Sequence, residues 1–493
     1  MRLTITIFFV FATFILFAQD NEIKRETKYT AEAGTIISTN GETPFWLRAN
    51  QYGIVPNQSP IFTLRGSVSS DYKKAITKED QYKLAKFDWG YGLNIVGNVG
   101  KENQFLIPEA YIKAKFGAFE IYAGRRREIF GLVDSTLSSG SYIWSGNALP
   151  IPKIQISTPN FVPLPYTKGF LSFKGTYAHG WFENSRTDVK NFYLHQKSLY
   201  FRLGKPDWKS HFYGGFNHQV QWGGILLYPD PTGYLSKDGK LPSSFQDYIG
   251  IVRGKSLAVE NDTNKFAGAD AGNRVGNHLG TIDFGFDIIV RNLKILVYRQ
   301  NIYEAGSLAH LSNIEDGLNG ISFINILKKK NLNIKKLTFE YLNTYSQGGS
   351  LGGNQTNSRL RGQELYFNHG QYIDGWSYLK NGIGTPFISN VINKDIPQSK
   401  LLFNNDRLQV IYVGIAGNIN CHTTFDLRIS HTKSLGSYLN TFSIPFEMIS
   451  SKLIIGKQIS RFENVDILAG ISFDSGKLFD SSFGLLFSVK KSW

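Results

Sequence analysis

The chain ends in Phe483-Gly484-Leu485-Leu486-Phe487-Ser488-Val489-Lys490-Lys491-Ser492-Trp493. Side chains of a β-strand alternate between its two faces, so most apolar residues of this stretch share one face and most small or polar residues share the other. A strand with one apolar face and an aromatic residue at the membrane edge is what the closing strand of an outer-membrane β-barrel requires. Taken alone, the same pattern also fits a strand of a soluble β-sandwich.

The opposite end of the chain has the features of a secretion signal. Met1-Arg2 gives a positive start, and residues 5–18 form an apolar stretch of about 14 residues before a plausible cleavage point at Ala18-Gln19. The stretch is short for a membrane-spanning helix, so an uncleaved anchor is the less favoured interpretation. We therefore expect residues 1–18 to be a signal peptide and the mature chain to be exported.

Segments that alternate with a period of two recur from about residue 60 to the end of the chain. In residues 282–288 and 425–430, for example, apolar side chains alternate with single charged or small ones. Single charges on the second face suit a water-filled lumen better than the core of a sandwich. At about 10 residues per spanning strand, the sequence predicts an all-β fold, a transmembrane antiparallel β-barrel of about 18 strands within a range of roughly 16 to 18.

Turn signals separate these segments. Arg291-Asn292 predicts a tight hairpin, whereas residues 228–233, 347–354 and 368–398 form longer stretches rich in glycine, proline or polar residues. This alternation predicts short periplasmic turns and long extracellular loops. Helical signals are sparse, and Ser307 is the best candidate to cap a short helix.

We expect three parts along the chain. The signal peptide, residues 1–18, precedes an N-terminal periplasmic or lumenal segment, residues 19–60, in which residues 27–38 have the pattern of one strand. The outer-membrane barrel then spans residues 61–493.

Composition indicates which partners suit the protein. The net charge is +15, which in an exported protein indicates acidic polysaccharide and the phosphates of lipopolysaccharide rather than nucleic acid. The other expected partners are outer-membrane lipids and the barrel-insertion machinery, which would bind the strand that ends in Trp493. Cys421 is the single cysteine, so a disulfide within the chain is impossible. It precedes an expected strand, and we expect it to be buried or to face lipid.

No motif predicts catalysis, a metal site or a cofactor. The Gly-x-Ser-x-Gly string at 348–352 lies in a glycine-rich loop, without the strand and helix that a nucleophile elbow needs. Asp283 and Asp287 share a strand face but are about 13 Å apart, too far for a glycosidase pair. We therefore expect no enzyme, and an outer-membrane enzyme acting on lipid or glycan is the weakest hypothesis.

The densest basic feature is the arginine run at 125–127, followed by an aromatic, turn-rich segment. Arginine binds carboxylates in a fork geometry, and flat aromatic rings cover the apolar faces of sugars. Arginines at a strand end also extend toward lipid headgroups, and aromatics also form membrane girdles, so both alternatives stay open. The candidate ligand-binding residues are Arg125, Arg127, Trp144, Trp222 and Trp376.

At these segments the chain resembles the Wzi-type capsule-assembly family of outer-membrane proteins, in its Bacteroidetes-like form. The resembling stretches are residues 43–53 (Thr43-Pro44-Phe45-Trp46-Leu47-Arg48-Ala49-Asn50-Gln51-Tyr52-Gly53), 124–132, 139–144, 146–152, 177–181, 217–219, 368–372 and 405–408. Each stretch is unspecific alone, and their order along the chain makes the match specific.

The resemblance implies an outer-membrane barrel of about 18 strands that acts as a lectin. Such a protein would bind exported capsular or surface polysaccharide and help to assemble or retain it at the cell surface. The strand pattern at 27–38 departs from the enterobacterial branch of the family, which carries a periplasmic helical region at its N-terminus. The alternative function is that of an outer-membrane porin or solute transporter.

Overall fold

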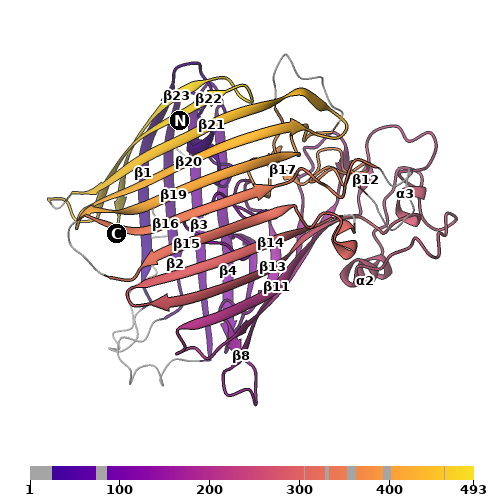
Figure 1. Ribbon diagram of the computed structural model, residues 1–493, viewed down its shortest axis with the longest axis horizontal. Coiled ribbons are helices and arrows are strands. Elements are labelled where there is room, and N and C mark those ends of the chain that lie inside the picture. Colours follow the sequence, from indigo (N-terminus) through magenta and orange to yellow (C-terminus); the bar gives the residue numbers. More distant parts are fainter. Residues whose placement is uncertain are drawn as a thin grey trace, which may run out of the picture.

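Eighteen antiparallel strands close into a barrel (Figure 1). The computed structural model describes residues 25–73, 86–304, 306–327, 332–351, 362–391, 401–459 and 461–493, so the expected signal peptide lies outside the described residues. The barrel strands are β1 (Thr27–Ser38), β2 (Ile61–Ser70), β3 (Phe87–Gly100), β4 (Gln104–Phe116), β5 (Phe119–Arg125), β6 (Lys153–Ser157), β8 (Leu171–Trp181), β10 (Tyr193–Leu203), β11 (Ser210–Trp222), β13 (Asn277–Val290), β14 (Leu293–Tyr303), β15 (Gly317–Asn325), β16 (Asn333–Asn343), β19 (Leu408–Asn420), β20 (Thr423–Gly436), β21 (Thr441–Gln458), β22 (Val465–Gly476) and β23 (Ser482–Ser492). The predicted fold class is confirmed.

The remaining elements lie in the connections between barrel strands. They are β7 (Val162–Pro163), β9 (Val189–Lys190), β12 (Ile225–Leu226), β17 (Ser377–Tyr378), β18 (Asn381–Gly382), α1 (Phe45–Arg48), α2 (Phe245–Arg253), α3 (Gly268–Ala271) and the 3₁₀ helix η3 (Ser307–His310). The short helix expected at Ser307 is thus a single 3₁₀ turn, whose N-cap is Gly306. None of the helices in the described part of the chain is both long and apolar enough to cross a membrane.

The first and last strands pair with each other and close the barrel. β1 is hydrogen-bonded to β23 from Thr30 opposite Ser492 to Ser38 opposite Gly484, and its other edge pairs with β2. The barrel therefore begins with the strand at 27–38 and not at residue 61, the boundary that the sequence suggested. The outward positions of β1 include small residues such as Ala31 and Ala33, which is why its alternation was weaker than that of the later strands.

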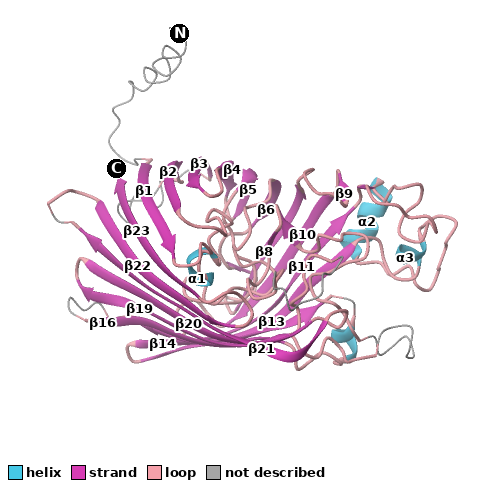
Figure 2. Ribbon diagram, turned by 90° about the horizontal axis from the view of Figure 1, so that it is seen from above, coloured by secondary structure: helices cyan, strands magenta, loops and turns pink. Residues whose placement is uncertain are grey.

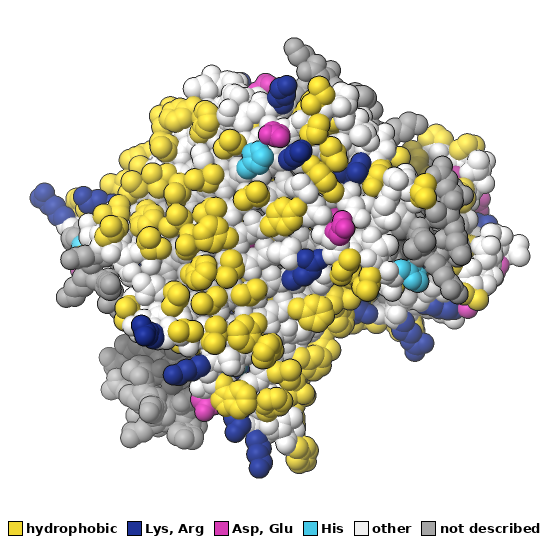
Figure 3. Space-filling view, viewed as in Figure 1, with side chains coloured by type: hydrophobic (Ala, Val, Ile, Leu, Met, Phe, Trp, Pro, Cys, Tyr) yellow, Lys and Arg dark blue, Asp and Glu magenta, His cyan; other side chains and the backbone are white. Residues whose placement is uncertain are grey.

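The outer wall of the barrel is apolar. In β23, Phe483, Leu485 and Phe487 are each between 41% and 49% exposed, whereas Ser488 on the opposite face is buried. Figure 3 shows hydrophobic side chains spread over the strands on the visible face of the barrel. Exposed apolar residues outside and polar residues inside are the reverse of a soluble protein and are typical of a lipid-facing barrel.

The two ends of the barrel differ in the length of their connections. One end carries the start of β1, the end of β23 and two-residue turns such as 117–118 and 291–292. The other end carries four long connections, residues 39–60, 126–152, 223–276 and 344–407. Because outer-membrane barrels have short periplasmic turns and long extracellular loops, the long-loop end faces the cell exterior.

Two turns at the periplasmic end had been examined in the sequence. The hairpin predicted at Arg291-Asn292 is confirmed, with Arg291 in the left-handed conformation at φ 53°. Cys421 is exposed in the turn between β19 and β20, so the expectation that it is buried or faces lipid was wrong. The strand that it was expected to start begins two residues later, at Thr423.

The hydrophobic core lies inside the barrel and is built mainly by loops. Three of the extracellular connections, 39–60, 126–152 and 344–407, contribute most of its aromatic residues, and they pack against one another between the walls. Figure 2 shows α1, part of the first connection, enclosed by the strands. We call the described parts of these three connections the lumenal plug. Residues 39–60 thus lie inside the lumen.

Candidate binding surface at the loop end of the barrel

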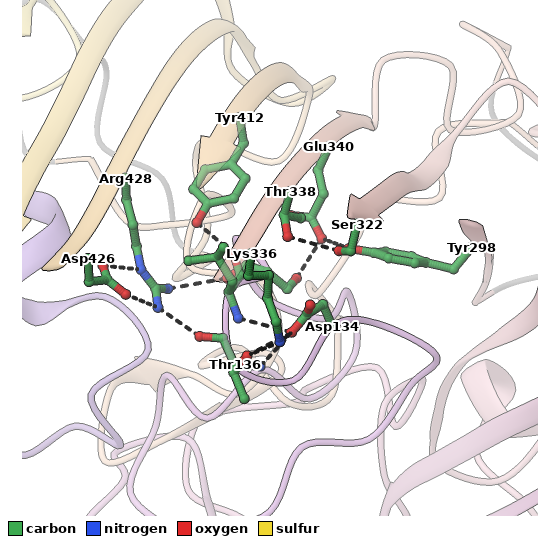
Figure 4. Close-up of polar contacts among 12 residues, drawn as sticks. Asp134, Thr136, Tyr298, Ser322, Lys336, Thr338, Glu340, Tyr412, Asp426 and Arg428 are labelled. Atoms are coloured by element: carbon green, nitrogen blue, oxygen red, sulfur yellow. Dashed lines mark hydrogen bonds and ion pairs between the residues drawn. The ribbon is translucent and has the colours of Figure 1, made fainter. Parts of the chain in front are cut away.

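The lumenal plug is fastened to the inner wall by polar contacts (Figure 4). The carboxylate of Glu340 on β16 accepts hydrogen bonds from Ser138 Oγ and the Ser139 amide, both at 2.6 Å, and from the hydroxyl of Tyr298 on β14. Asp283 on β13 accepts a bond from the Leu132 amide at 2.9 Å. Each of these carboxylates is buried, and hydrogen bonds to the loop compensate for part of the cost of burying it.

Cationic and phenolic side chains hold the same loop from the neighbouring strands. Lys336 Nζ lies 2.8 Å from Asp134 Oδ1, and Arg428 donates to the Thr136 carbonyl at 3.0 Å. The hydroxyl of Tyr412 donates to the Leu137 carbonyl at 2.7 Å. Burial would raise the pKa of Asp134, but Lys336 and Thr136 together hold it below its ordinary value. Residues 134–139 are therefore anchored to three neighbouring strands, β16, β19 and β20, that line one side of the lumen.

Two of the predicted ligand-binding residues lie in the middle of the lumenal plug. Trp144 and Trp376 are 6% and 0% exposed, and their rings pack 6.0 Å apart between centroids. Trp376 Nε1 donates to the Ile143 carbonyl at 2.8 Å. The two indoles therefore join the plug connections 126–152 and 344–407 to each other. Neither indole presents a free ring face to a sugar.

The two predicted arginines lie at the extracellular end of β5, where they are partly exposed. Arg125 donates to the hydroxyl of Tyr378 at 2.8 Å, and its Cζ is 5.7 Å from the centre of that ring. Arg127 donates to Asn94 Oδ1 at 3.0 Å, and its Cζ is 5.1 Å from the ring of Tyr52. Each arginine is thus paired with a tyrosine from a plug connection. We call Arg125, Arg127, Tyr52 and Tyr378 the arginine rim.

The charges of the three consecutive arginines are balanced differently. Arg126 is turned into the lumen, where it forms an ion pair with Glu120. Arg127 lies 3.9 Å from a carboxylate oxygen of Glu109. Arg125 has no carboxylate within 4.0 Å in the described ranges, so its positive charge is available to an anion. Burial raises the pKa of Tyr378 to about 12 although Arg125 lowers it, so this phenol stays protonated at neutral pH.

Trp222 occupies a different place from the other candidates. It ends β11 and faces outward, with its ring centre 5.1 Å from that of Tyr193 and 5.2 Å from that of Tyr248 on α2. It is only 5% exposed because α2 covers it from outside the barrel. The five candidates therefore divide into an arginine rim, a plug core and an outer-wall cluster, and the structure does not bring them together.

The tyrosines that accompany the arginines were not among the five candidate residues, although Tyr378 is recognisable in the sequence as an aromatic residue of a loop or strand end. Tyr378 is 253 residues from Arg125, and nothing local to either residue signals the contact. Tyr52 stands in the stretch 43–53 that carried part of the family resemblance, which was the one available hint. In the described part of the chain, no group of three or more histidine, cysteine, aspartate or glutamate side chains is arranged to hold a metal ion.

An apolar outer wall, short turns at one end and long loops that fill the lumen define the class of protein: an outer-membrane β-barrel with a plug made by its own loops. The family model described as capsule assembly protein Wzi matches residues 19–419. The chain therefore belongs to the Wzi capsule-assembly family and is a capsule-related protein of the outer membrane.

Among solved structures, the similarity to Wzi of Escherichia coli supports the barrel fold. Wzi of Escherichia coli, described as an outer-membrane protein involved in group 1 capsule assembly and a carbohydrate-binding β-barrel, is 12% identical, with a TM-score of 0.55 over 95% of this chain and 84% of that chain. OccK5 (OpdH) of Pseudomonas aeruginosa is 8% identical over 95% and 98% of the two chains, with a TM-score of 0.45. An anion-selective porin of Comamonas acidovorans is 8% identical over 96% and 100%, with a TM-score of 0.39. A search of curated proteins gives no significant match.

Proposed function

We propose that this protein is a surface lectin that binds exported acidic capsular or surface polysaccharide and helps to retain it at the cell. The observation that carries the proposal is the guanidinium of Arg125, which is partly exposed beside the phenol of Tyr378 at the extracellular end and lacks a carboxylate partner among the described residues. An arginine fork recognises carboxylate or phosphate groups, and an adjacent aromatic ring suits the apolar face of a sugar.

Binding at the arginine rim would gain strength because the polysaccharide repeats the same acidic group along its chain. A single guanidinium that binds one uronate or phosphate through charge-assisted hydrogen bonds contributes about 1.5–3 kcal/mol. One such contact is weak, but a polymer presents the same acidic group many times, so a released segment is replaced by its neighbour. The Escherichia coli protein that shares the fold is described as a carbohydrate-binding β-barrel, which supports the proposal that this chain binds polysaccharide.

The alternative of a porin or solute transporter needs a continuous aqueous path through the barrel. The lumenal plug argues against such a path, because its connections fill the space between the walls and are hydrogen-bonded to them. We further propose that the protein catalyses no reaction. The two aspartates considered for catalysis serve as lumenal anchors: Asp283 accepts from Leu132, and Asp287 accepts from Tyr213 at 2.8 Å.

The proposal is tested by binding of purified acidic polysaccharide to the detergent-solubilised protein, measured by surface plasmon resonance. Arg125→Gln removes the fork and its charge, and we expect roughly tenfold weaker binding, the equivalent of about 1.4 kcal/mol. Arg125→Lys keeps the charge but loses the fork, so an intermediate loss is expected. Lys209→Gln removes an exposed charge from a periplasmic turn and serves as the matched control.

Equal affinities for Arg125→Gln and Lys209→Gln would remove the arginine rim from the proposal. Binding that is absent even in the wild-type protein, with capsule supplied at high concentration, would remove the lectin function itself. Neutral polysaccharide provides the second comparison, because its binding should not respond to the charge at position 125.

A further inference from the structure

The connection between β11 and β13 contributes Leu226 and Leu241 of its first part to the lumenal core, but its second part lies outside the barrel, at the extracellular end of β11 (Figure 1). Its helix α2 begins with a reciprocal cap between Ser244 and Asp247 and ends at Gly254, which adopts the left-handed conformation at φ 64°. Ile251 of α2 is buried against Val220 and Trp222, which face outward from β11. We call residues 244–275 the lateral shelf.

The part of the outer wall that the lateral shelf covers differs in exposure from the part of the wall nearer the periplasmic end. Along the outward face of β11, Phe212 and Phe216 are 58% and 37% exposed, whereas His218 and Trp222, nearer the extracellular end, are buried at 6% and 5%. The outward face of β13 changes in the same way, from Ile282 at 40% to His278 at 5%. The lateral shelf therefore begins where the apolar, lipid-facing surface ends.

A contact at the end of α2 fixes its height on the wall. Lys197 faces outward from β10, and its Nζ donates a hydrogen bond to the Val252 carbonyl. Lys197 pairs with His218 across the strands, so the last turn of α2 lies at the border between the apolar wall and the covered wall. The helix thus lies beside the outer leaflet of the membrane.

The side of α2 that faces away from the wall is also apolar. Phe245 is 79% exposed and Ile249 is 37% exposed, and residues four apart share one face of a helix. A helix that is apolar on both of its sides is suited to burial and not to water. The last turn of α2 lies at the border of the lipid-facing wall, so lipid of the outer leaflet is a suitable surface to cover this second face.

A cavity of about 360 Å³ lies between α2, from Gln246 to Arg253, and residues 255–266, with Val275 and His278 at its base. Its apolar lining includes Ile251 and Phe266, and Arg253 and Lys265 stand at its border. Neither Arg253 nor Lys265 forms an ion pair with a residue that the structure describes.

The acidic groups of the cavity are engaged within the lateral shelf. Glu260 lies 2.9 Å from Lys255 Nζ, Asp247 belongs to the helix cap, and Asp262 accepts the Asn264 amide at 3.0 Å. The terminal carbonyls of α2, which would repel an anion, are bonded as well: those of Gly250 and Ile251 accept amides of the following residues, and that of Val252 accepts Lys197. The lining thus carries three cations and three carboxylates, and Lys255 pairs with Glu260, so Arg253 and Lys265 are the two cations that no carboxylate of the described chain binds directly.

We propose that the lateral shelf binds a phosphorylated glycolipid of the outer leaflet, with Phe245 and Ile249 against its acyl chains and Arg253 and Lys265 on a phosphate. An apolar floor beneath two cations matches the boundary between headgroup and acyl chain of such a lipid. The site would fix the barrel in the leaflet on the side of β10, β11 and β13, and it is independent of the arginine rim.

The position of α2 is tested with a spin label in a Cys421→Ser background, because Cys421 is the single cysteine and is exposed. In proteoliposomes that contain diphosphorylated lipid A, a label at Phe245→Cys should be accessible to oxygen and protected from a water-soluble nickel complex. A label at Asp238→Cys, an exposed loop position in the same connection, should show the opposite. Equal nickel accessibility at both positions would overturn the proposal.

The phosphate site is tested by native mass spectrometry of the protein in detergent with lipid A. The double variant Arg253→Gln/Lys265→Gln should bind diphosphorylated lipid A at least tenfold more weakly and should not change binding of the dephosphorylated lipid. Lys190→Gln/Lys240→Gln removes two exposed lysines that do not line the cavity and is the matched control. Unchanged affinity in the first variant, or dimers that protect position 245 without lipid, would also overturn the proposal.

Discussion

The carboxylate of Glu340 is buried inside the barrel and accepts hydrogen bonds from Ser138, from the Ser139 amide and from Tyr298. Glu340→Ala leaves these donors unsatisfied, so we expect a loss of roughly 3 kcal/mol of stability. We also expect transient ion conductance in planar bilayers, because the loop at 134–139 loses its central anchor. Unfolding is measured as the change in electrophoretic mobility when the protein is heated.

The control for this variant is Thr338→Val. Thr338 also faces the lumen from β16, but among the described residues its hydroxyl bonds only to Ser322 of the neighbouring strand, at 2.8 Å. The Thr338→Val variant should lose less stability than Glu340→Ala and should not raise ion conductance. Equal conductance in the two variants would show that Glu340 does not hold the plug.

Asp406 gives the plug a dependence on pH. It is fully buried, accepts hydrogen bonds from Asn368 at 3.0 Å and Gln347 at 3.2 Å, and its pKa is raised by burial to about 7 in spite of the neighbouring Arg407. In the unfolded chain an aspartate has a pKa near 3.9. A raised pKa favours the folded state when the group is protonated, so its contribution is complete below about pH 4 and is lost as pH rises to about 7.

We therefore expect the wild-type protein to be more resistant to urea at pH 5 than at pH 8, and Asp406→Asn to show a smaller difference. Within the window the slope is about 1.4 kcal/mol per pH unit for one group. Burial also raises the pKa of Glu304 and of Asp316, so the variant removes only part of the dependence. Asp480→Asn, at an exposed position, is the control, and an identical pH dependence in both variants would contradict the prediction.

At the scale of elements, the strands were predictable and the loops were not. A spanning strand meets lipid on one face and polar surroundings on the other along its whole length. The alternating residues of a segment such as 282–288 therefore predict a spanning strand without information from the rest of the chain. The last strand was predicted in the same way. β1 was placed outside the barrel because part of its lipid face is alanine, which gives little contrast with its polar face.

The candidate site was less predictable, because its contacts join distant parts of the chain. Trp376 bonds to the carbonyl of Ile143, 233 residues away, and no local pattern distinguishes a buried loop tryptophan from an exposed one. Arg125 and Arg127 could be proposed from the sequence because a run of charged residues is visible locally. α2 was missed although Ser244 and Asp247 form a recognisable cap, since Gly250 and its β-branched neighbours weaken the helical pattern.

The connection 126–152 joins two adjacent strands, so the barrel does not need its length. Replacing residues 132–145 by a four-residue Gly-Ser linker should leave the ladder of barrel strands intact, since neighbouring antiparallel strands can be joined by very short turns. The variant should form a stable pore in planar bilayers and should lose the anchors to β16 and β20.

The comparable deletion in the lateral shelf, residues 255–266, removes chain that lies outside the barrel and should give no conductance. If the shortened 126–152 variant remains closed, the other two plug connections are sufficient to seal the lumen, and the assignment of a central role to this loop is wrong.

The molecule combines a barrel whose lumen holds three of its own loops, an apolar outer wall and an excess of positive charge. Exposed tryptophans mark the two rims, with Trp89, Trp208 and Trp493 near the periplasmic end and Trp181 at the extracellular end of β8. Aromatic girdles of this kind set the height of a barrel in the bilayer. Lipid surrounds the wall and the plug occupies the lumen, so the extracellular surface is the part of the protein that can contact a polymer outside the cell.

A net charge of +15 should draw an acidic polymer to that surface over a distance that depends on salt. The screening length falls from about 30 Å at 0.01 M to about 10 Å at 0.1 M and about 3 Å at 1 M ionic strength. We expect the association rate with acidic capsular polysaccharide to fall at least tenfold between 0.05 M and 0.5 M sodium chloride, measured by surface plasmon resonance, with neutral dextran as the control. Salt-independent association would remove electrostatic attraction from the mechanism.

In the cell, the lectin proposal separates retention of polymer from its synthesis. Loss of the gene should leave total polysaccharide unchanged and move most of it from the cell pellet into the medium, because the protein would act after export. Complementation with Arg125→Gln should restore retention only in part, and Lys209→Gln should restore it fully. Polymer that disappears from both fractions would instead assign the protein to synthesis or export, and the polysaccharide would then have to pass the lumenal plug.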